Sequence, residues 1–304
     1  MMGNQLALIK REIWEHRSIY ISPIAIAVIV SLLTLTGQVS VSAYGDVVDL
    51  AMVSASNVAD LAHRRAMLTG AFSVVTTIFA FGAWIVMVFY CLDALYAERR
   101  DKSILFWRSL PVTDAETVVS KLLVAALVIP TAFLLAAFAT HLIMLILSTF
   151  WIMAEGGNAM HLIWKPAPFF DSWSGSIIVA FAMTMWLSPF LGWFLFVSAF
   201  AKRSPLLIAF LPIFVLPMLE KLLVKTELFW DAIFVRTFEP PLSKIDISVI
   251  EERGMIPMDA DSISILAVID LGKFLSSPSL WAGLAVCGVL TFGAIYVRRY
   301  RDDS

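Results

Sequence analysis

Blocks of apolar residues alternate with charged segments along the chain. A helix that crosses a bilayer needs about 20 mostly apolar residues. Six blocks are candidates, and none has Asp, Glu, Lys or Arg in its interior. They cover about residues 20–42, 68–92, 122–150, 172–200, 204–219 and 279–297. The pattern predicts an all-α polytopic membrane protein with six transmembrane helices in a single transmembrane domain, residues 1–304.

The fifth block is the shortest, and Pro212 and Pro217 lie within it. Proline removes a helical hydrogen bond, although neighbouring helices in a membrane can satisfy the freed carbonyl group. The block is therefore either a full span or a span that breaks and re-enters.

The segment before the first block, residues 1–19, has a helical apolar pattern. Its apolar positions are Leu6, Ile9, Ile13 and Trp14, and its charged positions are Lys10, Arg11, Glu12 and Glu15. We expect an amphipathic elbow helix on the membrane surface, with the charged positions on its solvated face.

The connection between the second and third blocks, residues 93–121, combines charged and apolar stretches. A charged run at 98–102 precedes the apolar triplet Leu105, Phe106 and Trp107, and Pro111 ends that stretch. Thr113 and Glu116 then have the spacing of a capping box, which begins a new helix. An exposed apolar triplet between charges indicates a docking element, because it would otherwise promote aggregation.

The connection between the fifth and sixth blocks, residues 220–278, is long. Its segments 226–238 and 262–275 carry bulky apolar residues but are too short to span a membrane. We expect re-entrant or interfacial helices there, separated by a polar and acidic surface loop at 239–261.

The composition and the distribution of charge support a membrane location. Apolar residues make up 60% of the chain, charged residues 15%, and the mean hydropathy is +0.86. These values exclude a disordered chain, a nucleic-acid-binding domain and an ordinary cytosolic enzyme. Lys and Arg number 13 in the 58 residues of one set of connections and tails, against 9 in the 105 residues of the other. The positive-inside rule places the first set, which includes both termini, in the cytoplasm.

The sequence contains no motif for chemistry of its own. There is no HExxH, no metal-ligand cluster and no Walker A loop, so we predict no catalytic residue, metal or cofactor in this chain. The charge-free spans disfavour ion-coupled transport. Cys91 and Cys287 are expected to be small packing residues and not a disulfide pair.

The charged segments resemble those of ABC-type export permeases of the ABC-2 superfamily. The matching features are Glu98 after the second span, the step Ser109-Leu110-Pro111-Val112-Thr113, Lys121 at the start of the third span, and the Arg-Glu-x-x-Glu-x-Arg run at 11–17. Asp101-Lys102-Ser103 departs from the Gly-Thr of many members. The resemblance implies the membrane subunit of a pump in the bacterial cytoplasmic (inner) membrane. A second permease copy (the same chain or a paralogue) and two ATPase subunits, which bind ATP and Mg, would complete it.

The resemblance also implies site residues. The 93–121 loop would be the coupling helix, with a second contact at 201–205, and a hairpin in 220–278 would form an outer gate. The ATPase-coupling residues would be Glu98, Arg99, Arg100, Leu105, Phe106, Trp107, Pro111, Lys202 and Arg203. In this arrangement Glu98, Arg99 and Arg100 make ion pairs at the rim of the ATPase contact.

A substrate path along spans two and five would be lined by Thr76, Thr77, Phe79 and Trp84. Such an uncharged wall suits a hydrophobic or amphipathic cargo, whether peptide, drug-like or lipid-like. Two alternatives stay open: a standalone carrier or channel, and a membrane assembly subunit that does not transport. The sequence names neither the cargo nor the permease partner, and the direction of transport comes from the resemblance alone.

Overall fold

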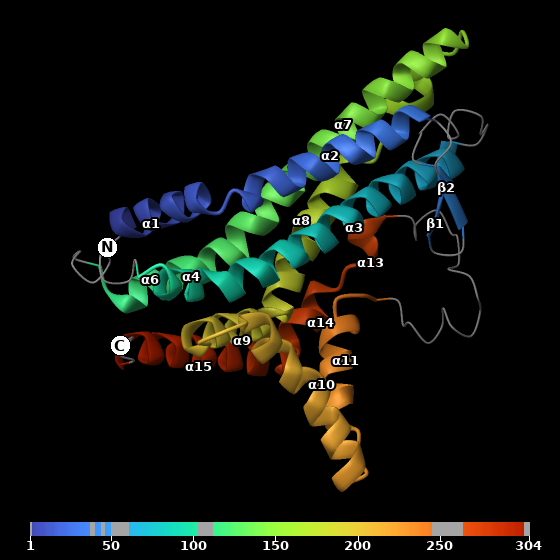
Figure 1. Cartoon of the computed structure of the whole chain (residues 1–304). Coiled ribbons are helices and arrows are strands. Elements are labelled where there is room, and N and C mark those ends of the chain that lie inside the picture. The colour runs from blue at the N-terminus through green and yellow to red at the C-terminus, as the bar shows by residue number, and fades with distance from the viewer. Residues whose placement is uncertain are drawn as a thin grey trace.

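The computed structural model describes residues 2–36, 40–43, 46–49, 61–102, 112–244 and 264–300. This part of the chain is helical apart from one antiparallel hairpin of β1 (Ser40–Ala43) and β2 (Asp46–Asp49), in which Ser40 pairs with Asp49 (Figure 1). The helices are α1 (Met2–Glu15), α2 (Ser18–Thr36), α3 (Leu61–Ala94), α4 (Tyr96–Arg100), α6 (Asp114–Leu123), η2 (Val124–Val128), α7 (Ile129–Ala154), η3 (Met160–Trp164), α8 (Phe169–Trp186), α9 (Ser188–Phe200), α10 (Pro205–Leu223), α11 (Leu228–Phe238), α13 (Ile265–Val268), α14 (Leu271–Ser276) and α15 (Pro278–Tyr300).

Five continuous helical stretches are long and apolar enough to cross a membrane, and a bent pair of helices makes a sixth candidate. The continuous stretches are 18–36, 61–100, 114–154, 205–223 and 278–300. The molecule is therefore built as a multi-pass membrane protein. Both termini lie at the same end of it, next to α4 and α6 (Figure 1).

The first and second spans differ from their predicted boundaries. Helix α2 ends at Thr36, and residues 40–42, which the prediction had placed in the span, belong to strand β1. Helix α3 begins at Leu61, seven residues before the predicted start at 68. Residues 40–42 read Ser-Val-Ser and carry no charge, so the apolar block does not mark the end of the helix, and Val41 suits a strand as well as a span.

The third span is one continuous stretch from Asp114 to Ala154. The helix expected from the capping box runs into the span without a break, through the π-helical turn η2. Pro130 follows this turn and has no N–H to donate, so the helical hydrogen-bond ladder lacks one bond at this point.

The fourth span, which was predicted as a single block at 172–200, is bent. Helices α8 and α9 meet at an angle of 53° between Trp186 and Ser188. Pro189 lies in the first turn of α9, where a missing N–H costs nothing. A proline within a continuous helix would instead remove a hydrogen bond and clash with the preceding turn. The span therefore breaks just before it.

The fifth span, α10, is a continuous helix in spite of Pro212 and Pro217. It turns away from the other spans and pairs with α11, so that the two form an arm that diverges from the bundle (Figure 1). Both Leu222 and Leu228, at the end of this arm, are more than 69% exposed.

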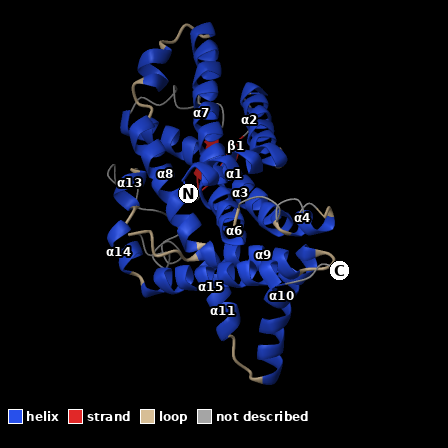
Figure 2. Cartoon of the chain, turned by 90° about the vertical axis from the view of Figure 1, so that its left-hand side faces the viewer, coloured by secondary structure: helices blue, strands red, loops and turns tan. Residues whose placement is uncertain are grey.

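The main core lies between α2, α3, α7 and α9, and Figure 2 shows α9 and α15 lying side by side below it. A smaller core surrounds Trp186 at the bend, where Phe274 and Leu280 pack around it. Cys91 and Cys287 are both buried as free thiols, which agrees with their predicted role as packing residues. The predicted short segments in the 220–278 connection are helical, as α11 and as the pair α13 and α14.

Candidate functional site

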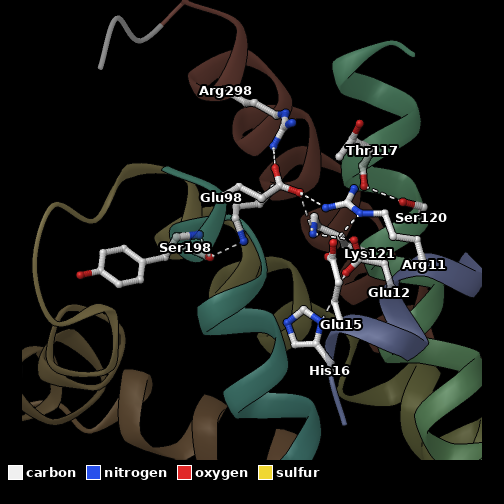
Figure 3. Close-up of polar contacts among 12 residues, drawn as sticks. Arg11, Glu12, Glu15, His16, Glu98, Thr117, Ser120, Lys121, Ser198 and Arg298 are labelled. Atoms are coloured by element: carbon white, nitrogen blue, oxygen red, sulfur yellow. Dashed lines mark hydrogen bonds and ion pairs between the residues drawn. The ribbon is translucent and has the colours of Figure 1, made fainter. Parts of the chain in front are cut away.

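A buried charge cluster joins four parts of the chain at the end where the termini lie. Its members are Arg11 and Glu12 of α1, Glu98 of α4, Lys121 of α6 and Arg298 of α15 (Figure 3). Asp114 of α6 joins them through Arg298. Arg11 also pairs with Glu15 at 2.8 Å, so with Glu15 counted the three cations meet four carboxylates. Its directly bonded pairs are up to 200 positions apart in the sequence, as Glu98 and Arg298 are.

Lys121 lies at the centre of the charge cluster and is 1% exposed. Its ammonium nitrogen is 2.8 Å from Glu12 Oε1 and 3.0 Å from Glu98 Oε1. One cation thus holds two carboxylates, one from the elbow helix and one from the start of the 93–121 connection. Glu12 itself is 1% exposed and also accepts a hydrogen bond from the Tyr90 hydroxyl at 2.9 Å.

Arg298 extends the charge cluster to the last helix. Its guanidinium group donates to Glu98 Oε2, and its Nε lies 2.9 Å from Asp114 Oδ1. Arg11 adds a longer contact, at 3.7 Å, to the other oxygen of Glu98. Glu98 therefore meets cations from α1, α6 and α15 at once.

Local backbone features present these side chains. Helix α3 ends at Ala94, and the backbone N–H groups of Leu95 and Tyr96 donate to the Ser198 hydroxyl at 3.0 and 2.9 Å. This break lets α4 turn Glu98 inward. Helix α6 begins with the predicted capping box, in which Glu116 N donates to Thr113 Oγ1 at 3.1 Å and Thr113 N donates to Glu116 Oε2 at 2.9 Å. The box fixes the start of α6 and with it the position of Asp114.

The charge cluster is costly to disturb. Taking charges out of water carries a penalty that only close pairing and further hydrogen bonds offset. Removing one partner of a buried pair leaves an uncompensated charge and costs about 3–5 kcal/mol. The four helix ends are therefore expected to move together and not independently.

The predicted coupling residues differ in burial and in their partners. Glu98, expected at the rim of a protein contact, is 5% exposed and inside the charge cluster. Arg99 is half-buried and donates to the carbonyls of Ser198 and Ala201 at 2.6 and 2.9 Å. Arg100 is exposed and pairs with Asp101 at 2.9 Å, and this hydrogen bond holds the pKa of Asp101 below its usual value.

The contacts of Arg99 bring together two segments that were both expected to face an ATPase. Lys202 and Arg203 are exposed in the turn that follows Ala201, which Arg99 binds. Leu105, Phe106, Trp107 and Pro111 lie outside the described residues. Their docking role stays a prediction.

The four residues expected to line a substrate path differ in burial and surroundings, so they do not form a single exposed surface. Phe79 is 1% exposed and belongs to the main core, whereas Thr77 is exposed and bonds the carbonyl of Ser73. Trp84 is half-buried against Phe190. Thr76 is half-buried with no hydrogen-bond partner for its hydroxyl among the described residues.

Most of the charge cluster was not expected from the sequence. Glu12 was assigned to the solvated face of the elbow helix, but it points inward to Lys121 while Leu6 and Trp14 are each 69% exposed. Lys121 is expected from the resemblance to open the third span, and Arg298 enters only through the count of basic residues after the last span. The available signal was their position, because each lies within about one turn of the end of a predicted apolar block.

One group of the described residues has the spacing of a metal site, namely Glu12, Glu15 and His16, whose ligand atoms lie within 4.8 Å of one another. Glu12 is already occupied by Lys121 and Tyr90, and Glu15 by Arg11. Since these carboxylates are neutralised by side chains, the group is explained as part of the ion-pair network.

Comparisons with known proteins add no family. The chain gave no match to the models of protein families, and it gave none to curated proteins or to solved structures.

Proposed function

We propose that the chain is the membrane-spanning permease subunit of an ATP-binding-cassette exporter in the bacterial cytoplasmic membrane. In this proposal it holds no catalytic residue. A pair of separate ATPase subunits hydrolyses ATP with Mg, and a second permease copy completes the pathway for a hydrophobic or amphipathic cargo.

The observation that carries the proposal is the charge cluster, because it clamps both ends of the 93–121 connection. Glu98 lies just before the apolar triplet 105–107, and Asp114 and Lys121 lie after it. The same side chains reach α1 through Glu12 and α15 through Arg298. A movement of the middle of this connection would be transmitted to α1, α4, α6 and α15 through buried ion pairs. An ATPase that moves the membrane helices requires a rigid connection of this kind.

The exposed features near this base fit an ATPase as the partner. The turn at 201–204 is tied to α4 through Arg99, and its Lys202 and Arg203 are exposed beside it. Exposed charges around an apolar centre are typical of protein interfaces, where the rim sets specificity and the buried anchor supplies most of the affinity. In this arrangement Trp107 is the anchor and Arg100, Lys202 and Arg203 are the rim.

The test is to purify the tagged full chain from its native membranes and to measure ATP hydrolysis in the eluate. Trp107→Ala should reduce the co-purifying activity strongly, since loss of a central aromatic anchor costs about 2 kcal/mol or more. Trp151→Ala is the matched control, because Trp151 is 47% exposed at the far end of α7 and should leave the activity unchanged.

Three outcomes separate the alternatives. ATP-dependent uptake of an amphipathic dye into inverted vesicles supports the permease. Transport by the purified chain without any ATPase would refute it in favour of a carrier or channel. An ATPase that co-purifies but drives no uptake of any amphiphile would indicate an assembly subunit.

A further inference from the structure

Arg236 of α11 is a cation held among apolar groups beside the bend of the fourth span. Its guanidinium carbon lies 4.0 Å from the centre of the Trp186 ring, and its NH1 group donates to the Ser279 carbonyl at 2.7 Å. Trp186 is only 2% exposed and forms the centre of the small core with Phe274 and Leu280. The cation thus lies against an aromatic face at the point where α8, α11 and α15 meet.

The charge of Arg236 has no counter-ion in the described part of the chain. None of the ion pairs among the described residues includes Arg236, and its Nε and NH2 groups have no hydrogen-bond acceptor there. A buried donor without an acceptor is costly, and an arginine has five N–H groups that suit a carboxylate or a phosphate. The cation–π contact with Trp186 and the hydrogen bond to the Ser279 carbonyl leave most of the five N–H groups without a partner among the residues that the structure describes.

The position of the Arg236 guanidinium group depends on the absence of a side chain at Gly283 of α15. A Cβ atom built on Gly283 of α15 would lie 1.7 Å from NH2 and 2.5 Å from the guanidinium carbon. Any larger residue at 283 would displace the guanidinium group. Both helices also carry exposed apolar side chains, namely Phe234 and Phe238 of α11, whose tilted rings have centroids 5.1 Å apart, and Trp281 of α15, which is 57% exposed.

We propose that Arg236 is the receptor for the anionic head group of an amphiphile, a phosphate or carboxylate attached to an apolar tail. The head group pairs with the guanidinium group in place of the Trp186 ring, and the tail lies in the apolar surroundings of α11 and α15. As a statement about cargo this rests on the proposed function, whereas the binding itself does not. Since α11 is attached to the bend through Arg236, binding also loosens the contact between this arm and the fourth span.

The experiment measures binding to the purified full chain in a neutral maltoside detergent by native mass spectrometry. The probes are dodecyl phosphate, dodecylphosphocholine with the same tail but no net charge, and inorganic phosphate without a tail. Dodecyl phosphate should bind more tightly than the other two. Arg236→Gln should weaken its binding about tenfold, because a charge-assisted hydrogen-bonded pair is lost, and should leave dodecylphosphocholine unaffected.

Two further variants make the result decisive. Lys273→Gln removes a positive charge from the exposed face of the neighbouring helix α14 and should leave binding unchanged. Arg236→Lys keeps the charge, so it should retain the preference for dodecyl phosphate at lower affinity, and it serves if Arg236→Gln does not fold. Equal loss in Lys273→Gln and Arg236→Gln would overturn the proposal, and so would equal binding of the anionic and zwitterionic probes.

The source of the anion is decided by the same measurement on protein taken directly from membranes. Phosphatidylglycerol that is retained by the native chain and lost from Arg236→Gln identifies a resident lipid. Retention that is equal in both, with dodecyl phosphate binding still lost in the variant, identifies a free amphiphile. Because no ATPase takes part, failure of the proposed function would not affect either result.

Discussion

Lys121 and Glu12 form a buried ion pair at 2.8 Å across 109 residues of sequence. This pair attaches the elbow helix α1 to the first turns of the third span. Because Lys121 also holds Glu98 at 3.0 Å, the elbow helix and both ends of the 93–121 connection share one cation. In the proposed function, the elbow helix α1 is therefore part of the charge cluster that supports the 93–121 connection.

Lys121→Met is expected to destabilise the protein by about 3–5 kcal/mol, since it leaves two buried carboxylates with one cation fewer. Thermal unfolding in detergent, followed by loss of the monodisperse species, measures the effect. Lys202→Met is the control, because Lys202 is exposed in the turn after α9 and its loss should change stability by less than about 0.5 kcal/mol. Similar melting temperatures for the two variants would show that the cluster contributes no net stability.

Glu98 and Arg298 are expected to be energetically coupled, because their side chains meet in the cluster although 200 residues separate them. A double-mutant cycle of Glu98→Gln and Arg298→Gln should give a coupling energy of about 1–3 kcal/mol. The measurement is reversible unfolding in mixed micelles. The pair Asp101→Asn and Arg298→Gln supplies the reference cycle, since Asp101 is exposed and bonds Arg100 instead. Its coupling should be near zero, and a value as large as that of the first cycle would contradict the direct contact.

The sequence predicted most of the spans, because each span needs an uninterrupted apolar block long enough to cross the hydrocarbon core of a membrane. It placed α15 within three residues at either end, and it identified the capping box of α6 correctly. It failed at Ser40–Ala43, because this short uncharged segment continues the apolar block without a charge or proline to mark where the span ends. It also missed the bend before Pro189, because a proline within an apolar block does not reveal whether the helix continues, as it does at Pro212, or breaks.

The charge cluster was beyond prediction for a different reason. Glu12 lies in α1, and Glu98 and Arg298 follow spans, all places where simple solvation or the positive-inside rule already accounts for charge. Only the packing of α1, α4, α6 and α15 brings them within bonding distance, and this packing depends on contacts that are remote in sequence. Periodicity also misplaced Glu12, because an amphipathic helix can bury one charged position when a counter-ion is available.

Asp171 at the start of α8 is expected to hold the short helix α13 in place. Its carboxylate accepts hydrogen bonds from Ser264, from Ile265 N at 2.9 Å and from Leu266 N at 3.3 Å. Asp171→Ala should therefore speed hydrogen–deuterium exchange across 264–270 by at least about tenfold, since charged hydrogen bonds contribute about 1.5–3 kcal/mol each. The global melting temperature should change much less, because α13 has only four residues.

Asp231→Ala provides the control for Asp171→Ala, because Asp231 is an exposed carboxylate on α11. It should leave exchange at 264–270 unchanged. Fast exchange of this segment in the native protein, or the same increase in both variants, would show that Asp171 does not fix α13.

Gly192 of α9 is expected to set the distance between α9 and α15. A Cβ atom added there would lie 3.0 Å from the Cα and 3.1 Å from the carbonyl oxygen of Cys287, and the backbone cannot yield unless the two helices separate. Gly192→Ala should therefore destabilise the protein by about 1–3 kcal/mol, as overpacked cores do. Gly288→Ala is the matched control on α15, where an added Cβ has no atom within 4 Å, and it should be neutral or stabilising by up to about 1 kcal/mol. Melting temperatures of the two variants in the same detergent decide the matter: if Gly192→Ala is as stable as Gly288→Ala, the two helices are not in close contact at this point.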